Sequence, residues 1–348
     1  MPNRLIPLLL LLFATTGLLS QPGGNSTFAF LELTSSARVA AMGGSVVAIW
    51  DDDLDLAFHN PALLNEGMSS HLALDYVNYF TDINYGYAAY AHGIDRIGML
   101  AAGIHCLDYG DFTEADRYGN ITGNFTAREY SADLIWSRTI DSLLHIGVNI
   151  KPAWSVLERY RSSAIAADLG VAYVSRDSLF TAGFVMKNIG TQVRPYYAGH
   201  RERLPFEMEI GVSQKLEHAP FRFSVTAHNL QQFNVSYIDE VTSLDPFTGE
   251  PVEQNRIEDF ADKMMRHVIF GVEFMPFDAL HLRFGYNYLR RQELKIEPRM
   301  AAVGFSWGFG LNIRGMRLSY GKASYHVAGG TNHFSLSTDL SSLFNRKI

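Results

Sequence analysis

The chain has 348 residues and a formal net charge of -7, and its Lys and Arg residues form no cluster. This charge distribution makes nucleic acid an unexpected partner. Only 19% of the residues are charged and 13% are aromatic, a composition that suits a surface partly facing lipid but also allows a secreted soluble β-protein. The single cysteine, Cys106, cannot form an intramolecular disulfide, so backbone pairing and packing must hold the fold together.

The first residues have the three-part form of a secretory signal peptide. Arg4 precedes an apolar run from Leu5 to Phe13, which small and polar residues follow. The run is shorter than the roughly 20 apolar residues that a membrane-spanning helix needs, which argues against a retained anchor. The sequence therefore predicts a signal peptide over residues 1–20, with cleavage near Ser20 or Gln21, and export from the cytoplasm.

The rest of the chain has the pattern of a membrane barrel. No stretch approaches 18 uninterrupted apolar residues, so we expect no transmembrane helix. From about Ser69 to Leu340, apolar and small or polar residues alternate in segments of about ten residues, and strands can cross a bilayer only as a sheet closed on itself. We predict an all-β fold, a transmembrane antiparallel β-barrel over residues 69–348 with about 14 strands. The strands are expected near 70–80, 82–92, 96–107, 126–139, 143–156, 162–175, 179–189, 204–216, 220–235, 266–276, 279–290, 298–308, 310–325 and 331–340.

The clearest segment shows how the two faces of the wall are expected to differ. Its apolar face carries Tyr130, Ala132, Leu134 and Trp136, and its polar face carries Glu129, Ser131, Asp133 and Ser137. A soluble β-sandwich would alternate in the same way, so the pattern alone leaves both folds open. For a barrel we expect Leu134→Arg to impair insertion at a cost of about 2–4 kcal/mol, and Asp133→Arg to be mild.

Connection lengths are consistent with a barrel that has both termini at one rim. The three longest connections, near 108–125, 190–203 and 236–265, follow odd-numbered strands, and even-numbered strands end in tight turns. With both termini in the periplasm, every long loop would face outward from the outer membrane of a Gram-negative bacterium.

Aromatic residues gather near the ends of several predicted strands. Membrane barrels place such rings in girdles at the headgroup level, and the alternative is the core of a soluble sheet. The residues expected in the girdles are Tyr76, Tyr79, Phe80, Tyr85, Tyr87, Phe305, Trp307 and Phe309.

Residues 21–68 precede the barrel and form a separate N-terminal segment, because from residue 28 onward they do not alternate cleanly. Within this segment, TSSARVAAMGG predicts a short helix with Ser35 or Ser36 as its cap and Gly43-Gly44 at its end. Asn60-Pro61 predicts a turn toward the wall. Because the segment carries both apolar residues and an acidic run, we expect it to be a plug, or hatch, in the barrel lumen.

The sequence ARVAAMGGSVVAIWDDDLDLAFHNPALL resembles the opening of long-chain fatty acid transporter-like (FadL-type) outer-membrane barrels and of their PorV-like relatives in the type IX secretion system. Further similarity runs through VMKNIGTQ, LPFEMEIGVSQKL, HNLQQFNVSY, RFGYNYLRRQELK and SYGKASYHVAGGTNHFSLS. Together these segments look most like the PorQ-like members of that system. The plug residues singled out by the resemblance are Arg38, Met42, Gly43, Gly44, Asp51, Asp52, Asp53, Asn60 and Pro61.

The resemblance implies a barrel with a plug and, for PorQ-like members, a non-enzymatic role in type IX protein secretion, anchoring the cell-surface attachment complex through the outer loops. The implied partners are outer-membrane lipid and PorZ-like, PorU-like and PorV-like subunits. The FadL-like opening implies an alternative, an outer-membrane transporter of hydrophobic small molecules, which predicts an apolar pocket in the lumen. A lumen filled by polar plug contacts would argue against transport.

The end of the chain departs from the family pattern. Outer-membrane barrels commonly finish on an aromatic residue, whereas this chain finishes Phe344-Asn-Arg-Lys-Ile348. Either the last strand runs past Leu340 to include Phe344, or the insertion signal is atypical.

Catalytic motifs are missing from the sequence, since it contains no HExxH, CxxC, GxSxG or GxxxxGK[ST] string. We therefore expect no enzymatic activity and no cofactor. Four histidines could converge on a metal ion, but we expect them to be isolated side chains instead. They are His59, His71, His92 and His105. The acidic run could bind a hard cation, form a solvated turn or pair with Arg38. It lacks the Gly and the terminal Glu of an EF-hand loop. Its residues are Asp51, Asp52, Asp53 and Asp55.

The long connection from Ile238 to Met264 is the remaining candidate site. It combines the string DPFTGEP with several carboxylates and little apolar content. It could dock a protein partner or be a solvated loop, because its length and polarity fit both. The residues expected in docking are Asp245, Pro246, Phe247, Gly249 and Glu250.

Overall fold

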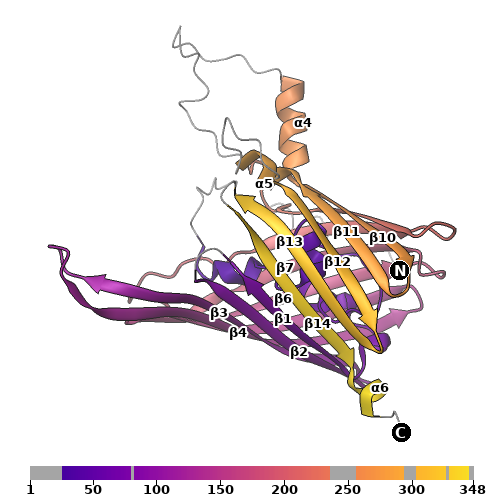
Figure 1. The fold of residues 1–348 in the computed structure, drawn as a ribbon, viewed down its shortest axis with the longest axis horizontal. Helices are drawn as coiled ribbons and strands as arrows, with labels where there is room; N and C mark the ends of the chain where they lie inside the picture. Colours follow the sequence, from indigo (N-terminus) through magenta and orange to yellow (C-terminus); the bar gives the residue numbers. More distant parts are fainter. Residues whose placement is uncertain (1–25, 80–81, 236–255, 294–302, 327–328, 345–348) are drawn as a thin grey trace, which may run out of the picture.

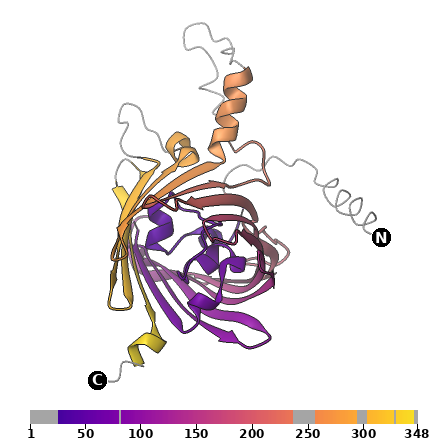
Figure 2. The same ribbon diagram turned by 90° about the vertical axis from the view of Figure 1, so that its right-hand side faces the viewer.

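The computed structural model describes residues 26–79, 82–235, 256–293, 303–326 and 329–344. Within these residues, fourteen antiparallel strands close into a barrel in which β1 pairs with β14 (Figure 1 and Figure 2). The predicted fold class, a closed antiparallel barrel, is confirmed. The strands are β1 (His71–Asn78), β2 (Asn84–Ile94), β3 (Gly98–Ala115), β4 (Ile121–Asp141), β5 (Leu144–Leu157), β6 (Tyr160–Val174), β7 (Phe180–Arg194), β8 (Glu207–Lys215), β9 (Phe221–Ala227), β10 (Val268–Phe277), β11 (Leu280–Asn287), β12 (Phe305–Ile313), β13 (Met316–His326) and β14 (Gly329–Asp339).

The first and last strands meet directly and close the sheet. Their ladder runs from His71 opposite Asp339 to Asn78 opposite Asn332. This pairing satisfies the backbone groups that an open sheet would leave along its two edges. It is the arrangement in which strands can cross a bilayer.

The two faces of the wall differ as the alternation predicts. On β4, Leu134 is 57% exposed and points away from the lumen, whereas Asp133 is fully buried inside. Asp133 lies 2.9 Å from His105 Nε2 and accepts a hydrogen bond of 3.0 Å from Asn149 Nδ2. The expectation that Asp133→Arg would be mild must be corrected, because the change places a buried cation beside His105 and Asn149 and removes the carboxylate that they contact.

The aromatic residues fall on both faces of the wall. Tyr76 and Trp307 are on the outer surface, with exposed fractions of 49% and 46%. Tyr85 and Tyr87 are buried and face the lumen, so their assignment to a girdle is wrong. On β2, alternate residues face the lumen, and Tyr85 and Tyr87 occupy such positions, as Ala89 does. Of the others, Phe305 and Phe309 are exposed, Tyr79 packs against an inner cluster, and Phe80 lies outside the described residues.

The connection between β3 and β4 differs most from its prediction. The expected loop near 108–125 largely continues both strands, with Thr113 opposite Asn124 and Glu114 opposite Gly123. The resulting hairpin projects beyond the barrel, at the left of Figure 1. Beyond Asp108 and Ala127 these strands pair only with each other, so neither face is buried and the period-two pattern weakens.

Other boundaries also shift. β9 ends at Ala227 instead of near residue 235, and β12 begins at Phe305 instead of near residue 298. The last strand ends at Asp339 and is followed by α6 (Leu340–Phe344), so Phe344 belongs to a helix and not to the strand. In the long connections, the described residues form α4 (Arg256–Arg266) and α5 (Tyr288–Glu293). None of the described helices is long and apolar enough to cross a membrane.

Connection length distinguishes the two ends of the barrel. We call the end with the shorter connections the turn end and the opposite end the loop end. The turn end has the connections 95–97, 142–143, 175–179, 216–220, 278–279 and 314–315. The longest connections, 195–206, 228–267 and 288–304, are all at the loop end.

Residues 28–68, which we call the plug, lie inside the ring of strands, where Figure 2 shows them in indigo and violet. Ser36 caps α2, since its side chain accepts a hydrogen bond of 3.4 Å from the Val39 amide. Gly43 and Gly44 follow with φ of 104° and 102°, which glycine adopts without strain. The plug elements are η1 (Ala29–Glu32), α2 (Ala37–Ala41), α3 (Leu56–His59), η2 (Pro61–Leu63) and η3 (Glu66–Met68).

The plug touches the wall at positions where the wall has no side chain. Gly147 on β5 and Gly170 on β6 lie opposite each other in the sheet. A Cβ at Gly147 would come within 2.2 Å of the Pro61 carbonyl carbon, and one at Gly170 within 2.1 Å of Asn60 Oδ1. Only glycine allows so close an approach, so this pair forms the seat of η2.

Candidate functional site in the barrel lumen

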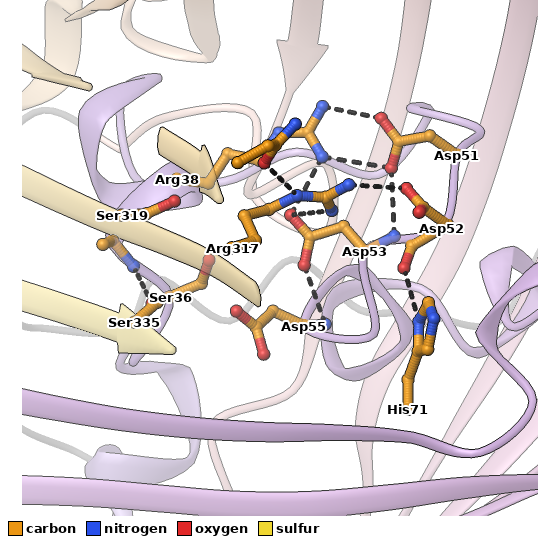
Figure 3. A network of polar contacts seen from close by, with 12 residues as sticks. Ser36, Arg38, Asp51, Asp52, Asp53, Asp55, His71, Arg317, Ser319 and Ser335 are labelled. Carbon is orange, nitrogen blue, oxygen red and sulfur yellow. Dashed lines mark hydrogen bonds and ion pairs between the residues drawn. The ribbon is translucent and has the colours of Figure 1, made fainter. Parts of the chain in front are cut away.

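Arg38 joins the plug to the wall through a buried guanidinium. Its side chain is 5% exposed, and all five of its N–H groups donate hydrogen bonds. Nε and Nη2 each donate to Glu273 at 2.8 Å. Nη1 donates to Asp51 at 3.0 Å and to Asp53 at 2.9 Å, and Nη2 also donates to Asp51 at 2.7 Å. These bonds, some of which Figure 3 shows, fix α2 and the acidic run to β10.

Glu273 on β10 is the partner of Arg38 in the wall. It also accepts a hydrogen bond of 2.9 Å from Arg222 on β9 and another of 2.9 Å from Arg283 on β11. Arg222 in turn donates to Asp51 at 2.8 Å. Sequence reasoning missed these three wall residues. The signal for them was a charged residue at an inward position on each of three consecutive strands.

Asp52 pairs with a different arginine. Its Oδ1 accepts a hydrogen bond of 2.8 Å from Arg317 on β13, and its backbone oxygen lies 3.0 Å from His71 Nδ1 (Figure 3). We call the whole group the ionic layer: Arg38, Arg222, Arg283, Arg317, Asp51, Asp52, Asp53 and Glu273. Its four guanidinium groups balance its four carboxylates, so the layer carries no net charge when every member is ionised.

Neighbouring side chains of opposite charge favour the charged forms of Asp51 and Arg38, the plug residues at the centre of the ionic layer. Burial raises the pKa of Asp51, but Arg38 and Arg222 outweigh burial and hold that pKa well below its usual range. Burial lowers the pKa of Arg38, but Asp51 and Glu273 outweigh it and raise that pKa. The acidic run therefore binds arginines. Across the described ranges, no group of three His, Cys, Asp or Glu side chains is placed to hold a metal ion.

Asp55 differs from the other acidic residues of the plug. It is buried, and its backbone amide donates to Asp53 at 3.3 Å. Burial, together with the charges of Asp75 and Asp53, raises its pKa well above the usual range. Asp55 is therefore not part of the ionic layer.

The remaining plug residues predicted from the sequence support the plug itself. Met42 is buried among apolar plug residues. Asn60 Nδ2 donates to the Val47 carbonyl at 2.8 Å, and Asn60 Oδ1 accepts from the Ala62 amide at 3.1 Å, which starts η2 at Pro61. The five residues expected in partner docking, Asp245 to Glu250, lie outside the described residues.

The four histidines named as metal candidates occupy three separate places. His59 and His105 flank the ring of Phe58, with ring centroids 5.4 Å and 4.3 Å from it. His71 is at the turn end beside the ionic layer, and His92 is exposed on the outer surface.

A cavity of about 600 Å³ lies at the loop end, between the start of the plug and the inner face of the wall. Its volume is within the range of small-molecule sites, roughly 300–1,000 Å³. We call it the loop-end cavity. Its apolar and aromatic lining is Phe28, Ala29, Tyr109, Phe112, Ala127, Leu157 and Tyr196, and its polar lining is Ser26, Thr27, Glu129 and Glu202.

The lumen changes character toward the turn end. A second cavity there, of about 300 Å³, is lined mainly by polar and charged side chains. Arg38, Asp51 and Arg222 of the ionic layer are among them. An apolar molecule would therefore find more favourable walls in the loop-end cavity than in the charged cavity at the turn end.

No protein-family model and no curated protein matches this chain. Among solved structures, the Ralstonia pickettii toluene transporter TbuX is similar at a TM-score of 0.51 and 12% identity, over 89% of this chain and 98% of that chain. A deltaS2 mutant of the monoaromatic hydrocarbon channel TodX has a TM-score of 0.51 and 13% identity, over 88% and 97%. A Pseudomonas aeruginosa FadL homologue has a TM-score of 0.46 and 10% identity, over 87% and 97%. The first two likenesses show that this chain shares the barrel fold of those two proteins, and at such identity they show the fold alone.

Proposed function

We propose that this chain is an outer-membrane barrel that takes up a predominantly apolar small molecule through its loop-end cavity. The observation that carries the proposal is an apolar and aromatic cavity of about 600 Å³ between plug and wall. The FadL-like opening of the sequence supports it. So does the shared fold, since the structures with that fold are of a toluene transporter and a monoaromatic hydrocarbon channel.

The ionic layer determines how a bound molecule could leave. Ion pairs between the plug and the wall lie toward the turn end, which argues against a straight pore for apolar molecules. Moving such a molecule through the layer would separate buried charges from their partners. Release must therefore follow displacement of the plug or pass through the wall.

Placement in the outer membrane with the loop end outward is part of the same proposal. Apolar side chains such as Ile104, Leu134 and Ile210 are exposed on the outer face of the wall. All of the longest connections are at the loop end, as in barrels whose short turns are periplasmic.

The lipid-facing assignment of Leu134 gives a testable result. Leu134→Arg should destabilise the inserted barrel by about 2–4 kcal/mol, because it places a charge in hydrocarbon. The fraction that migrates as folded barrel in unheated gels, after refolding into vesicles, measures this effect. The matched control is Thr113→Arg on the projecting hairpin, which should fold like the parent. Equal folded fractions for the two variants would contradict the placement.

Filling the loop-end cavity should weaken binding without unfolding the barrel. Ala127 lines the cavity and is buried, so Ala127→Trp would occupy the space of the ligand. We expect at least a tenfold weaker affinity for toluene, measured by calorimetry in nanodiscs. Ala102→Trp, the same change on the outer face of β3, should leave the affinity unchanged. Toluene binding that survives Ala127→Trp would place the site elsewhere.

The second candidate is the anchoring role in type IX secretion that the resemblance implies. The observation in its favour is α4, which stands away from the barrel at the loop end (Figure 1 and Figure 2) and carries Phe260 and Met264, 56% and 44% exposed. Purification in mild detergent should then recover PorZ-like, PorU-like or PorV-like proteins. Recovery of the barrel alone, under conditions that keep related complexes intact, would count against it.

A further inference from the structure

Glu129 is a buried carboxylate that no side chain of opposite charge neutralises. It lies on β4, is 5% exposed, lines the loop-end cavity, and accepts a hydrogen bond of 2.7 Å from Tyr109 Oη. In the described part of the chain, no Lys, Arg or His forms an ion pair with it. Because a buried charge is costly unless it is paired, a cation that binds beside Glu129 would stabilise this carboxylate.

Three other buried carboxylates of the lumen, Asp168, Glu209 and Glu273, have cationic partners. Asp168 lies 2.7 Å from Lys151 Nζ, and Glu209 lies 2.9 Å from Lys187 Nζ. Glu273 has its three arginines. Asp55 and Asp75 are also buried and form no ion pair among the described residues, but neither of them lines the loop-end cavity as Glu129 does.

The other walls of the cavity also suit a cation. Glu202 adds a second carboxylate, and the described lining residues include no Lys, Arg or His. Tyr109, Phe112 and Tyr196 present aromatic rings, whose faces attract an ammonium group. The same walls would repel a carboxylate and leave it without a partner.

We infer that the loop-end cavity selects amine-bearing apolar molecules, such as arylalkylamines, over neutral ones and rejects carboxylates of similar shape. The ammonium group binds between Glu129 and the aromatic rings, and the apolar body lies against Ala127 and Leu157. This inference rests on the proposed function, since it assigns the chemical class of the molecule that the cavity takes.

The test compares three probes that share one apolar skeleton: phenylpropylamine, propylbenzene and phenylpropanoate. Affinities are measured by calorimetry for the full barrel in uncharged nanodiscs. A charge-assisted hydrogen bond contributes about 1.5–3 kcal/mol, so the amine should bind at least about tenfold more tightly than propylbenzene. Phenylpropanoate should bind more weakly than propylbenzene.

Glu129→Gln isolates the charge, because glutamine keeps the shape and an acceptor for Tyr109. The preference for the amine over propylbenzene should fall to about threefold or less, while propylbenzene affinity stays unchanged. Glu114→Gln, on the exposed hairpin, should keep the full preference. If Glu129→Gln fails to fold, Glu202→Gln provides the second variant and should reduce the same preference.

The outcomes separate the two proposals. Equal affinities for the amine and propylbenzene, or a preference that survives in both Glu129→Gln and Glu202→Gln, would overturn the amine selectivity and leave uptake of apolar molecules standing. Tightest binding of phenylpropanoate would overturn the selectivity in the same way. Failure of all three probes to bind would overturn the proposed function itself.

Discussion

Arg38→Ala will release the plug from the wall and destabilise the folded barrel by about 3–5 kcal/mol, the usual effect of removing one partner from a buried ionic group. The change removes five hydrogen bonds and leaves the ionic layer with four carboxylates and three guanidinium groups. Asp53 loses its partner at 2.9 Å and retains only Arg317 at 3.9 Å. The thermal midpoint of the folded gel band measures stability, and protease cleavage within residues 28–68 reports plug release.

Arg128→Ala is the matched control for that experiment. Arg128 pairs with Asp108 at 2.9 Å on the outer face, where both side chains are substantially exposed. Removing an exposed pair costs about 1 kcal/mol or less, so this variant should keep a protected plug. If Arg38→Ala and Arg128→Ala behaved alike, the ionic layer would not be what holds the plug.

Gly147→Val should displace η2 from its seat and cost about 3 kcal/mol, the upper part of the range for overpacking a core. The new Cβ would meet the Pro61 carbonyl carbon at 2.2 Å and the Ala62 nitrogen at 2.4 Å. Both are backbone atoms, which cannot rotate away as the end of a flexible side chain would. Denaturant titration of the folded band gives the free-energy change, and cleavage near η2 reports the displacement.

Gly86→Val tests whether the loss of stability in Gly147→Val comes from the position in the wall or from valine itself. Gly86 lies at an outward position on β2, and its nearest contact for a Cβ would be an ordinary 3.7 Å. This variant should stay within about 0.5 kcal/mol of the parent, as for most surface changes. A large loss in Gly86→Val, matching that of Gly147→Val, would refute the tight seat.

The barrel could be predicted because its signal is local. Alternation on β4 separates Leu134 from Asp133 whatever the rest of the chain does, and the cap at Ser36 and the glycines after α2 act within one turn. The projecting hairpin could not be predicted because it lacks this local signal. Its two strands pair only with each other, so burial on one face does not impose a pattern there.

The ionic layer and the cavity depend on contacts between distant parts of the chain. Arg38 could be matched to Asp51 nearby, but its wall partner Glu273 is 235 positions away, and only barrel closure brings the two together. Tyr85 and Tyr87 were assigned by their place near a strand end, although their inward positions on β2 decide their facing. Glu129 looked like one of several polar lumen residues until the structure placed it beside an aromatic cavity without a cation.

Photocrosslinking can show whether an apolar molecule binds inside the loop-end cavity. A diazirine-bearing arylalkyl probe is irradiated with the barrel in nanodiscs, with and without excess propylbenzene, and the labelled peptides are identified by mass spectrometry. Lipid-facing positions such as Leu134 will take up label that the competitor does not remove. If the molecule binds in the cavity, we expect additional labelling near Tyr109, Phe112 and Leu157, and propylbenzene should suppress it. Labelling restricted to lipid-facing positions, with none that the competitor suppresses, would contradict this binding.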